Sequence, residues 1–201
     1  MCIRDSLSDT QRFAIDYMRL DPQGQLVHGD PSDYRNYTAF GAEVLAVADA
    51  TVVATLDNLP EQVPGSLPDP STITLETVDG NHVILDLGDG RYAFYAHLQP
   101  GSVRVQAGQR VTRGQPLGLL GNTGNTSAPH LHFHVMDGPS VLGSNGLPFT
   151  IDTFSLAGRI DPAQYNAAQD LTGVWNRGAF PAPQPLSRTY PLGLDLIDFP
   201  G

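Results

Sequence analysis

The chain contains no lysine and only one cysteine, Cys2. A single cysteine cannot form an intramolecular disulfide, so an extracytoplasmic, a cytosolic and a secreted location fit equally well. Acidic residues outnumber basic ones, the formal net charge is −10, and no basic cluster is present, so we expect no nucleic-acid partner. No apolar run approaches the length of a transmembrane helix. Residues 1–6 also lack the apolar core of a signal peptide.

Charged residues make up only 16% of the 201 residues, whereas glycine and proline are abundant, at 21 and 17. This length allows one domain with a substantial core. The composition favours a turn-rich β protein over a helical bundle. We therefore expect a mainly β fold, with a single antiparallel sheet or sandwich and long loops, that acts as a monomer.

The sequence divides into three parts. Residues 1–10 resemble neither a strand nor a targeting segment, and a core-like pattern begins abruptly after them, so we expect this segment to be truncated or non-native. Residues 11–157 carry the β domain. Residues 158–201 form a C-terminal extension, with a short helix predicted over 161–171 and a proline-rich tail from Gly178 that wraps the surface or is partly disordered.

Strands are predicted where apolar and β-branched residues alternate between turn signals. The turn signals are clearest at Asp49-Ala50 and at Gly88-Asp89-Gly90, the latter typical of a hairpin. The predicted strands are residues 13–20, two within 41–55, 73–77, 81–87, 91–98, tight reversals within 103–121, and 149–156.

Residues 121–135 are the most informative stretch. Glycine and asparagine mark its first half as a tight loop, and residues 130–135 then alternate histidine with an apolar residue. A period of two predicts a strand with His130, His132 and His134 on one face and the apolar residues on the other.

Imidazoles on one strand face suit metal ligation or proton transfer near neutral pH. Neighbours on such a face lie roughly 7 Å apart, so one metal is awkwardly placed to bind two adjacent rings. We expect one ring to be a ligand and its neighbour to lie beside the bound water. The alternative is a polar face with solvated histidines. His82, at the start of a predicted strand, is expected to be structural.

Gly-Asn-Thr-Gly at residues 121–124 and Pro-His-Leu-His-Phe at 129–133 together resemble the signature of the M23 (lysostaphin/LytM-like) zinc metallopeptidases. The family usually has Glu at the position of His134. The resemblance implies that His132 binds Zn²⁺ and that His130 is a catalytic histidine beside the metal. It covers roughly residues 13–135, including a hairpin similar to biotinyl/lipoyl-like folds.

Two further positions match the family. Tyr-Ala-His-Leu at residues 95–98 places His97 at a second catalytic histidine, and Phe-Ala-Ile-Asp places Asp16 at the aspartate ligand of a His-x-x-x-Asp motif. Alternation along the strand puts Phe94 on one face and His97 on the other. The alternatives are a strand-end histidine bonded to backbone and an edge aspartate facing water.

The chain departs from the family at the first metal ligand. Arg12 stands four residues before Asp16, and a guanidinium cation cannot bind a metal. Gln11 offers only a carbonyl oxygen, a weak choice for zinc. The third ligand therefore remains open between a residue lost upstream, His134, Gln11 and His28.

The resemblance implies a zinc metalloendopeptidase that cuts peptidoglycan cross-bridges or stem peptides in the cell envelope, in the periplasm or after secretion. The missing upstream histidine favours an alternative, a degenerate LytM-like module that binds or activates other wall hydrolases. The composition argues against a biotinyl/lipoyl-like carrier, which needs a lysine at the hairpin tip, because the chain has none.

Overall fold

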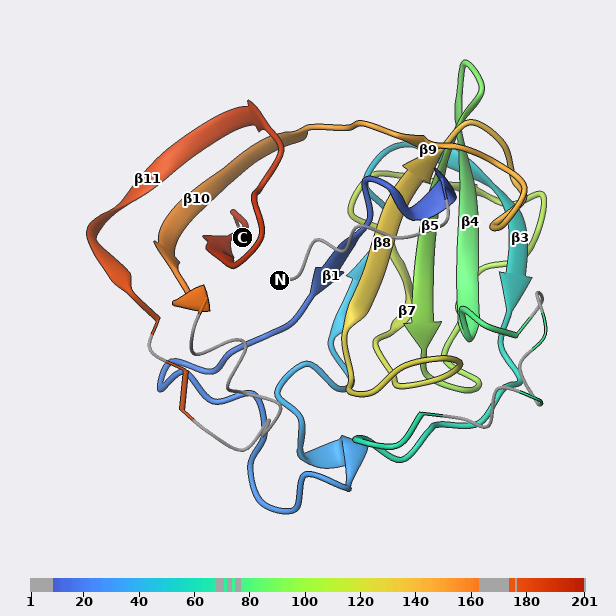
Figure 1. The fold of residues 1–201 in the computed structure, drawn as a ribbon. Coiled ribbons are helices and arrows are strands. Elements are labelled where there is room, and N and C mark those ends of the chain that lie inside the picture. The colour runs from blue at the N-terminus through green and yellow to red at the C-terminus, as the bar shows by residue number, and fades with distance from the viewer. Residues whose placement is uncertain are drawn as a thin grey trace.

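The computed structural model describes residues 9–67, 71, 74, 77–162, 174–175 and 177–200. These residues are mainly β, in antiparallel sheets, with two 3-10 helices, η1 (Asp9–Gln11) and η2 (Tyr34–Asn36) (Figure 1). The predicted fold class is confirmed. Within the described ranges, no helix is long and apolar enough to cross a membrane.

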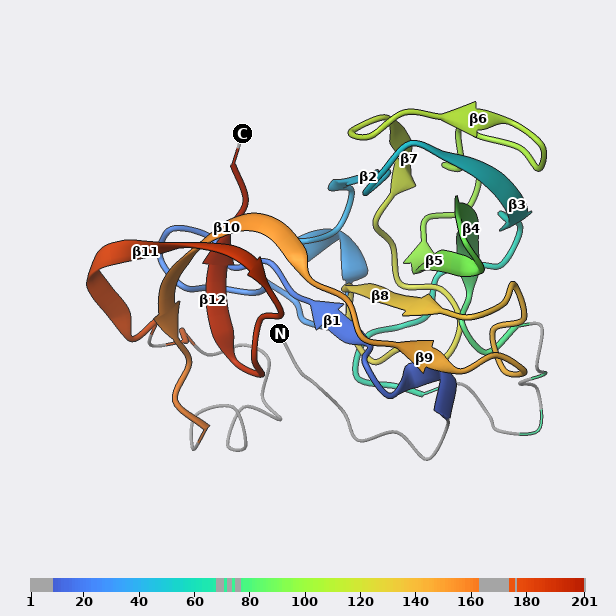
Figure 2. The same cartoon turned by 90° about the horizontal axis from the view of Figure 1, so that it is seen from above.

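A seven-stranded sheet positions the site. Its strands run in the order β1-β8-β5-β4-β3-β6, and β9 pairs with β8 (Figure 2). Their bounds are β1 (Ile15–Tyr17), β3 (Ala50–Leu56), β4 (Asn81–Gly88), β5 (Arg91–Leu98), β6 (Arg110–Val111), β8 (Leu131–Met136) and β9 (Gly146–Leu147). A separate two-stranded sheet pairs β2 (Glu43–Leu45) with β7 (Pro116–Leu119).

Most predicted strands are confirmed, including the pair within 41–55 and those at 81–87, 91–98 and 149–156. The predicted strand 13–20 is shorter, because β1 spans only Ile15–Tyr17. Most of the predicted strand 73–77 lies outside the described residues, and Thr77 at its end is in a turn.

The β4–β5 hairpin has the predicted turn. Its two central residues, Asp89 and Gly90, have φ values of 52° and 69°. Positive φ at both positions is the geometry of a type I′ turn, whose twist matches that of the flanking strands. This turn joins β4 and β5 as antiparallel neighbours, and β5 pairs with β8 along its other edge.

The sheet packs an apolar cluster on each face. The larger cluster includes Val83, Tyr95 and Phe133, and the smaller one includes Phe94 and Met136. Because side chains alternate along a strand, Leu131, Phe133 and Val135 of β8 face the larger cluster, as predicted, whereas Met136 at its end belongs to the smaller one. The histidines of β8 face the side of the smaller cluster.

The C-terminal tail was predicted to wrap the surface or to be partly disordered, and two segments of it form strands instead. β11 (Ala179–Thr189) and β12 (Asp195–Asp198) flank β10 (Ile151–Arg159) in a three-stranded sheet. Successive residues of an antiparallel strand direct their N–H groups to opposite sides. The prolines of β11 alternate with other residues, and β11 is an edge strand. The N–H groups that the prolines lack are therefore all on one side of the strand, and the backbone hydrogen bonds on the other side can form.

The short helix predicted over 161–171 lies outside the described residues except at its first two positions. β10 runs across residue 157, and the division of the chain at this point stays a prediction. So does the relation to biotinyl/lipoyl-like folds.

Candidate metal centre

Neighbouring strands of the seven-stranded sheet bring the site together from distant parts of the chain. Asp16 on β1 lies directly opposite His132 on β8, and Ala96 on β5 lies opposite His132 on its other side. His97 follows Ala96, and Asp79 lies two residues before β4. Residues 116 positions apart in the sequence thus become cross-strand neighbours.

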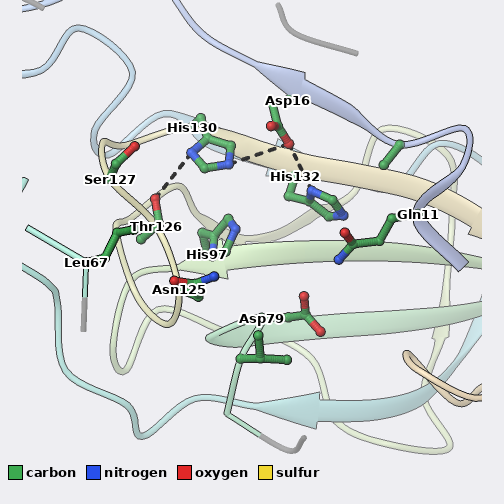
Figure 3. Close-up of a pocket in the computed structure, with 12 residues that line it drawn as sticks. Gln11, Asp16, Leu67, Asp79, His97, Asn125, Thr126, Ser127, His130 and His132 are labelled. Atoms are coloured by element: carbon green, nitrogen blue, oxygen red, sulfur yellow. Dashed lines mark hydrogen bonds and ion pairs between the residues drawn. The ribbon is translucent and has the colours of Figure 1, made fainter. Parts of the chain in front are cut away.

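The cavity that these strands form has a volume of about 210 Å³ and is lined by Asp16, Asp79, His97 and His132 (Figure 3). Its walls also include Gln11 and His130. All four residues that we predicted for the site, Asp16, His97, His130 and His132, line this cavity. Their convergence is a structural result, whereas their roles remain predictions.

Asp16 accepts a hydrogen bond at its Oδ1 from His132 Nδ1, 2.9 Å away, and the same oxygen lies 3.6 Å from His130 Nε2. Burial by itself would raise the pKa of Asp16, but the His132 bond and the surrounding imidazoles hold that pKa far below its usual value. Asp16 is therefore an ionised carboxylate, a suitable metal ligand.

The backbone sets the orientation of the two predicted catalytic rings. His97 Nδ1 donates to the carbonyl of Thr123 at 2.7 Å, and His130 Nδ1 donates to the carbonyl of Ala128 at 2.7 Å. A neutral imidazole has one donor and one acceptor nitrogen, so the neutral His97 ring carries an unprotonated Nε2. Burial and the neighbouring His130 and His132 hold the pKa of His97 well below its ordinary value.

His97 does not lie where simple alternation predicts. Strict period two places it on the face opposite His132, but its ring centroid lies 4.7 Å from that of His130 and 6.0 Å from that of His132. The cause is an irregularity in β5. The β4–β5 register shifts here, and His97 has a φ of 64°, in the left-handed region. The prediction about its face was wrong.

The imidazoles also approach one another more closely than we predicted from strand spacing. His97, His130 and His132 each offer a nitrogen, and these three nitrogens lie within 4.8 Å of one another. The rings of His130 and His132, two positions apart in the sequence, can therefore serve one centre.

The structure separates the candidates for the third ligand. Gln11, at the end of η1, lines the cavity. His28 is half exposed, lies 3.1 Å from an oxygen of Asp21, and is not among the described residues of the cavity wall. His134 is fully buried behind His132 and is likewise absent from that wall as described. Arg12 is exposed, with its guanidinium 5.8 Å from the Phe13 ring centroid.

Asp79 is a site residue that the sequence did not reveal. It is 6% exposed, lines the cavity, and its carboxylate makes no hydrogen bond or ion pair with any described residue. In Figure 3 the carboxylate points into the cavity, towards Gln11 and His132. Burial raises its pKa to about 6, partly opposed by His132. In the sequence, Val-Asp-Gly indicates only a turn.

Comparison with known proteins adds an independent finding. The model of peptidase family M23 matches residues 34–143, more than half of the chain. The matched range contains His97, His130 and His132 but begins after Asp16, which the structure places beside them.

Several relatives are peptidoglycan enzymes. The chain is 42% identical over 57 residues to the peptidoglycan DD-endopeptidase ShyA of Vibrio cholerae, covering 28% of this chain and 13% of ShyA. It is 45% identical over 58 residues to the glycyl-glycine endopeptidase ALE-1 of Staphylococcus capitis, covering 28% of this chain and 16% of ALE-1. The chain thus spans a small part of the length of these relatives.

Among solved structures, the catalytic domain of lysostaphin from Staphylococcus simulans is similar at 22% identity, with 62% of this chain and 84% of that chain covered and a TM-score of 0.38. Assignment to a family depends on the family-model match, which extends over most of the seven-stranded sheet. On that match, the chain belongs to peptidase family M23.

Proposed function

We propose that this chain is a zinc-dependent endopeptidase domain that hydrolyses peptide bonds of peptidoglycan. The observation that carries the proposal is the cavity in which an ionised carboxylate and three imidazoles converge. A structural cluster of buried polar groups satisfies itself with hydrogen bonds. Here, by contrast, the neutral His97 keeps an unprotonated Nε2 in the cavity wall.

The donor set fits zinc. Nitrogen from histidine and oxygen from aspartate are typical zinc ligands, and a catalytic site leaves one position for water. Asp16 and His132 would hold the ion, because their donor atoms already lie 2.9 Å apart on adjacent strands. When bound, zinc lowers the pKa of a water molecule towards neutrality and polarises the scissile carbonyl.

Charge indicates where the third donor lies. Asp16 and Asp79 are two carboxylates on the wall of one cavity, and the described lining residues include no arginine. Two buried carboxylates match the charge of a divalent cation, which offsets the cost of burying them. Among the other oxygen donors on the wall, we therefore favour the Asp79 carboxylate over the neutral amides of Gln11 and Asn125.

The two remaining imidazoles move protons. His130 Nε2 lies near Asp16 and would accept a proton from the attacking water and then give it to the leaving amine. His97, neutral and nearly buried, would accept a hydrogen bond or proton at Nε2 and, once protonated, stabilise the developing oxyanion. Both functions require the backbone carbonyls that keep the proton on Nδ1.

The substrate assignment is supported by the relatives, of which ShyA is a peptidoglycan DD-endopeptidase and ALE-1 a glycyl-glycine endopeptidase. We propose peptidoglycan cross-bridge or stem peptides as substrates, the cell envelope as the location, and a monomer as the working form.

Metal analysis combined with digestion of purified peptidoglycan tests the proposal. We expect about one zinc per chain, release of new amino termini, and loss of both in Asp16→Asn and His132→Ala. The matched control is Asp89→Asn at the exposed hairpin tip, where asparagine also tolerates positive φ. Peptidoglycan cleavage that persists in His132→Ala would contradict the mechanism.

A non-catalytic module is the second candidate, because Arg12 occupies the position of the usual histidine ligand. This candidate predicts no stoichiometric zinc and no cleavage in the wild-type protein, together with binding to peptidoglycan or to another hydrolase.

A further inference from the structure

The His132 ring is held at both of its nitrogens. Nδ1 lies 2.9 Å from Asp16 Oδ1, and Nε2 lies 3.1 Å from His134 Nδ1. A neutral imidazole carries one hydrogen, which resides on one nitrogen or the other. The partners at the two nitrogens therefore decide which one presents a lone pair.

His134 is built into the apolar side of the sheet. It is 0% exposed, lies opposite Phe94 across the β5–β8 ladder, and has its ring centroid 4.9 Å from that of Phe94. A charged ring would be costly in this fully buried, apolar surrounding, so the ring is neutral and keeps one acceptor nitrogen. Its Nε2 is buried and has no hydrogen-bond partner among the described residues.

We propose that His134 is a positioning residue that determines which nitrogen of His132 faces the metal. In this assignment His134 Nδ1 accepts a hydrogen bond from His132 Nε2–H, so the lone pair of His132 Nδ1 points to the cation beside Asp16. The inference rests on the zinc site of the proposed function. Histidine ligands generally donate their second N–H to a neighbouring acceptor that fixes the tautomer, and here that acceptor is another imidazole.

An imidazole differs from a carboxylate in this role because it can also donate. In the metal-free protein the ionised Asp16 can only accept, so its bond with His132 uses Nδ1–H. With a neutral His132, Nε2 then bears the lone pair, and His134 must donate from its own Nδ1.

Metal binding therefore reverses the direction of the His132–His134 hydrogen bond. The hydrogen of each ring moves from Nδ1 to Nε2 by exchange with solvent, so each ring keeps one hydrogen and no net proton is released. His134 Nε2 changes from an unpaired acceptor to an unpaired donor within the apolar side of the sheet.

Long-range ¹H–¹⁵N spectra of histidine-labelled protein, recorded at mildly alkaline pH without and with zinc, read the tautomers directly. We expect Nδ1–H on His132 and His134 in the metal-free protein and Nε2–H on both rings after zinc loading. A zinc-loaded protein in which His134 keeps Nδ1–H would overturn the inference and leave the proposed function intact.

Zinc affinity, measured by competition with a chromophoric chelator, provides a second readout. His134→Phe removes the acceptor and should weaken zinc binding by about 10–100-fold. His134→Gln supplies an amide oxygen as acceptor and should restore most of the affinity. His82→Phe is the matched control, because that ring packs on the same Phe94, with centroids 5.4 Å apart, from the neighbouring strand β4.

The outcomes separate the two hypotheses. Equal zinc affinity in wild type and His134→Phe overturns the positioning role only. A wild-type protein that binds no zinc overturns the proposed function and this inference together. If His134→Phe fails to fold, the tautomer spectra of the wild-type protein and the zinc affinity of His134→Gln still test the positioning role of His134.

Discussion

His97 combines a strained backbone with an imidazole in the cavity, and two substitutions separate these properties. Its φ of 64° lies in the left-handed region, which costs an L-residue roughly 1–2 kcal/mol. Glycine escapes this cost, but it adds about 0.4–1 kcal/mol of conformational entropy to the unfolded chain. We therefore expect His97→Gly to be more stable than His97→Ala by about 0.5–1 kcal/mol.

This difference is measurable by thermal unfolding. For a chain of this size, 1 kcal/mol corresponds to a shift in Tm of about 2–4 °C, so the glycine variant should unfold about 1–4 °C higher than the alanine variant. Both variants lack the ring nitrogen that faces the cavity, and both should cleave a peptide substrate about 10²–10⁴-fold more slowly. Zinc content should not change, because Asp16 and His132 are intact.

Three results would refute this reasoning, one for the backbone strain, one for the catalytic role and one for the metal ligands. An alanine variant as stable as the glycine variant would show that the irregularity in β5 stores no strain. Cleavage at the wild-type rate in both variants would remove His97 from the catalytic mechanism. Loss of zinc in both would make His97 a metal ligand. His82→Ala, a histidine substitution on the adjacent strand β4 outside the cavity wall as described, is the control for nonspecific damage.

The remaining predictions concern Asp79 on the cavity wall and two residues beside Thr123, Glu61 and Gly80. Asp79→Asn should weaken zinc binding by about 10–100-fold relative to Asp89→Asn in chelator competition, and equal affinities would exclude Asp79 as a donor. Burial raises the pKa of Glu61 to about 7, so the stability from its neutral form is present below its ordinary pKa and is lost as the pH rises through about 7. The Tm of Glu61→Gln should therefore fall less than that of wild type between mildly acidic and mildly alkaline pH, and parallel curves would contradict this. Gly80→Ala should cost about 2–3 kcal/mol in denaturant unfolding, because Gly80 has a φ of 66° and a Cβ there would lie 2.2 Å from the carbonyl oxygen of Thr123; unchanged stability would show that the loop adjusts freely.

Local pattern in the sequence was sufficient for several features. Alternation over residues 130–135 predicted the strand β8 and the shared direction of its histidines, because side chains of a strand point to opposite faces with a period of two. Gly88-Asp89-Gly90 predicted the hairpin, because positive φ at the turn restricts the residue types. Both signals lie within a few consecutive residues.

Other features were inaccessible because they depend on contacts between distant segments. The proline-rich segment of β11 looks irregular until β10 lies beside it and makes it an edge strand. Asp79 looks like a turn residue until the cavity forms around it.

The sequence by itself determined the chemical groups, their order and the face that most of them share within one strand. Only the tertiary structure decided that Asp16 pairs with His132, that an irregular residue turns His97 to their side, and that His134 supports His132 from behind. The physical reason is that alternation is a property of a single strand. Register and bulges, in contrast, are set by hydrogen bonds and packing between strands that are far apart in the chain.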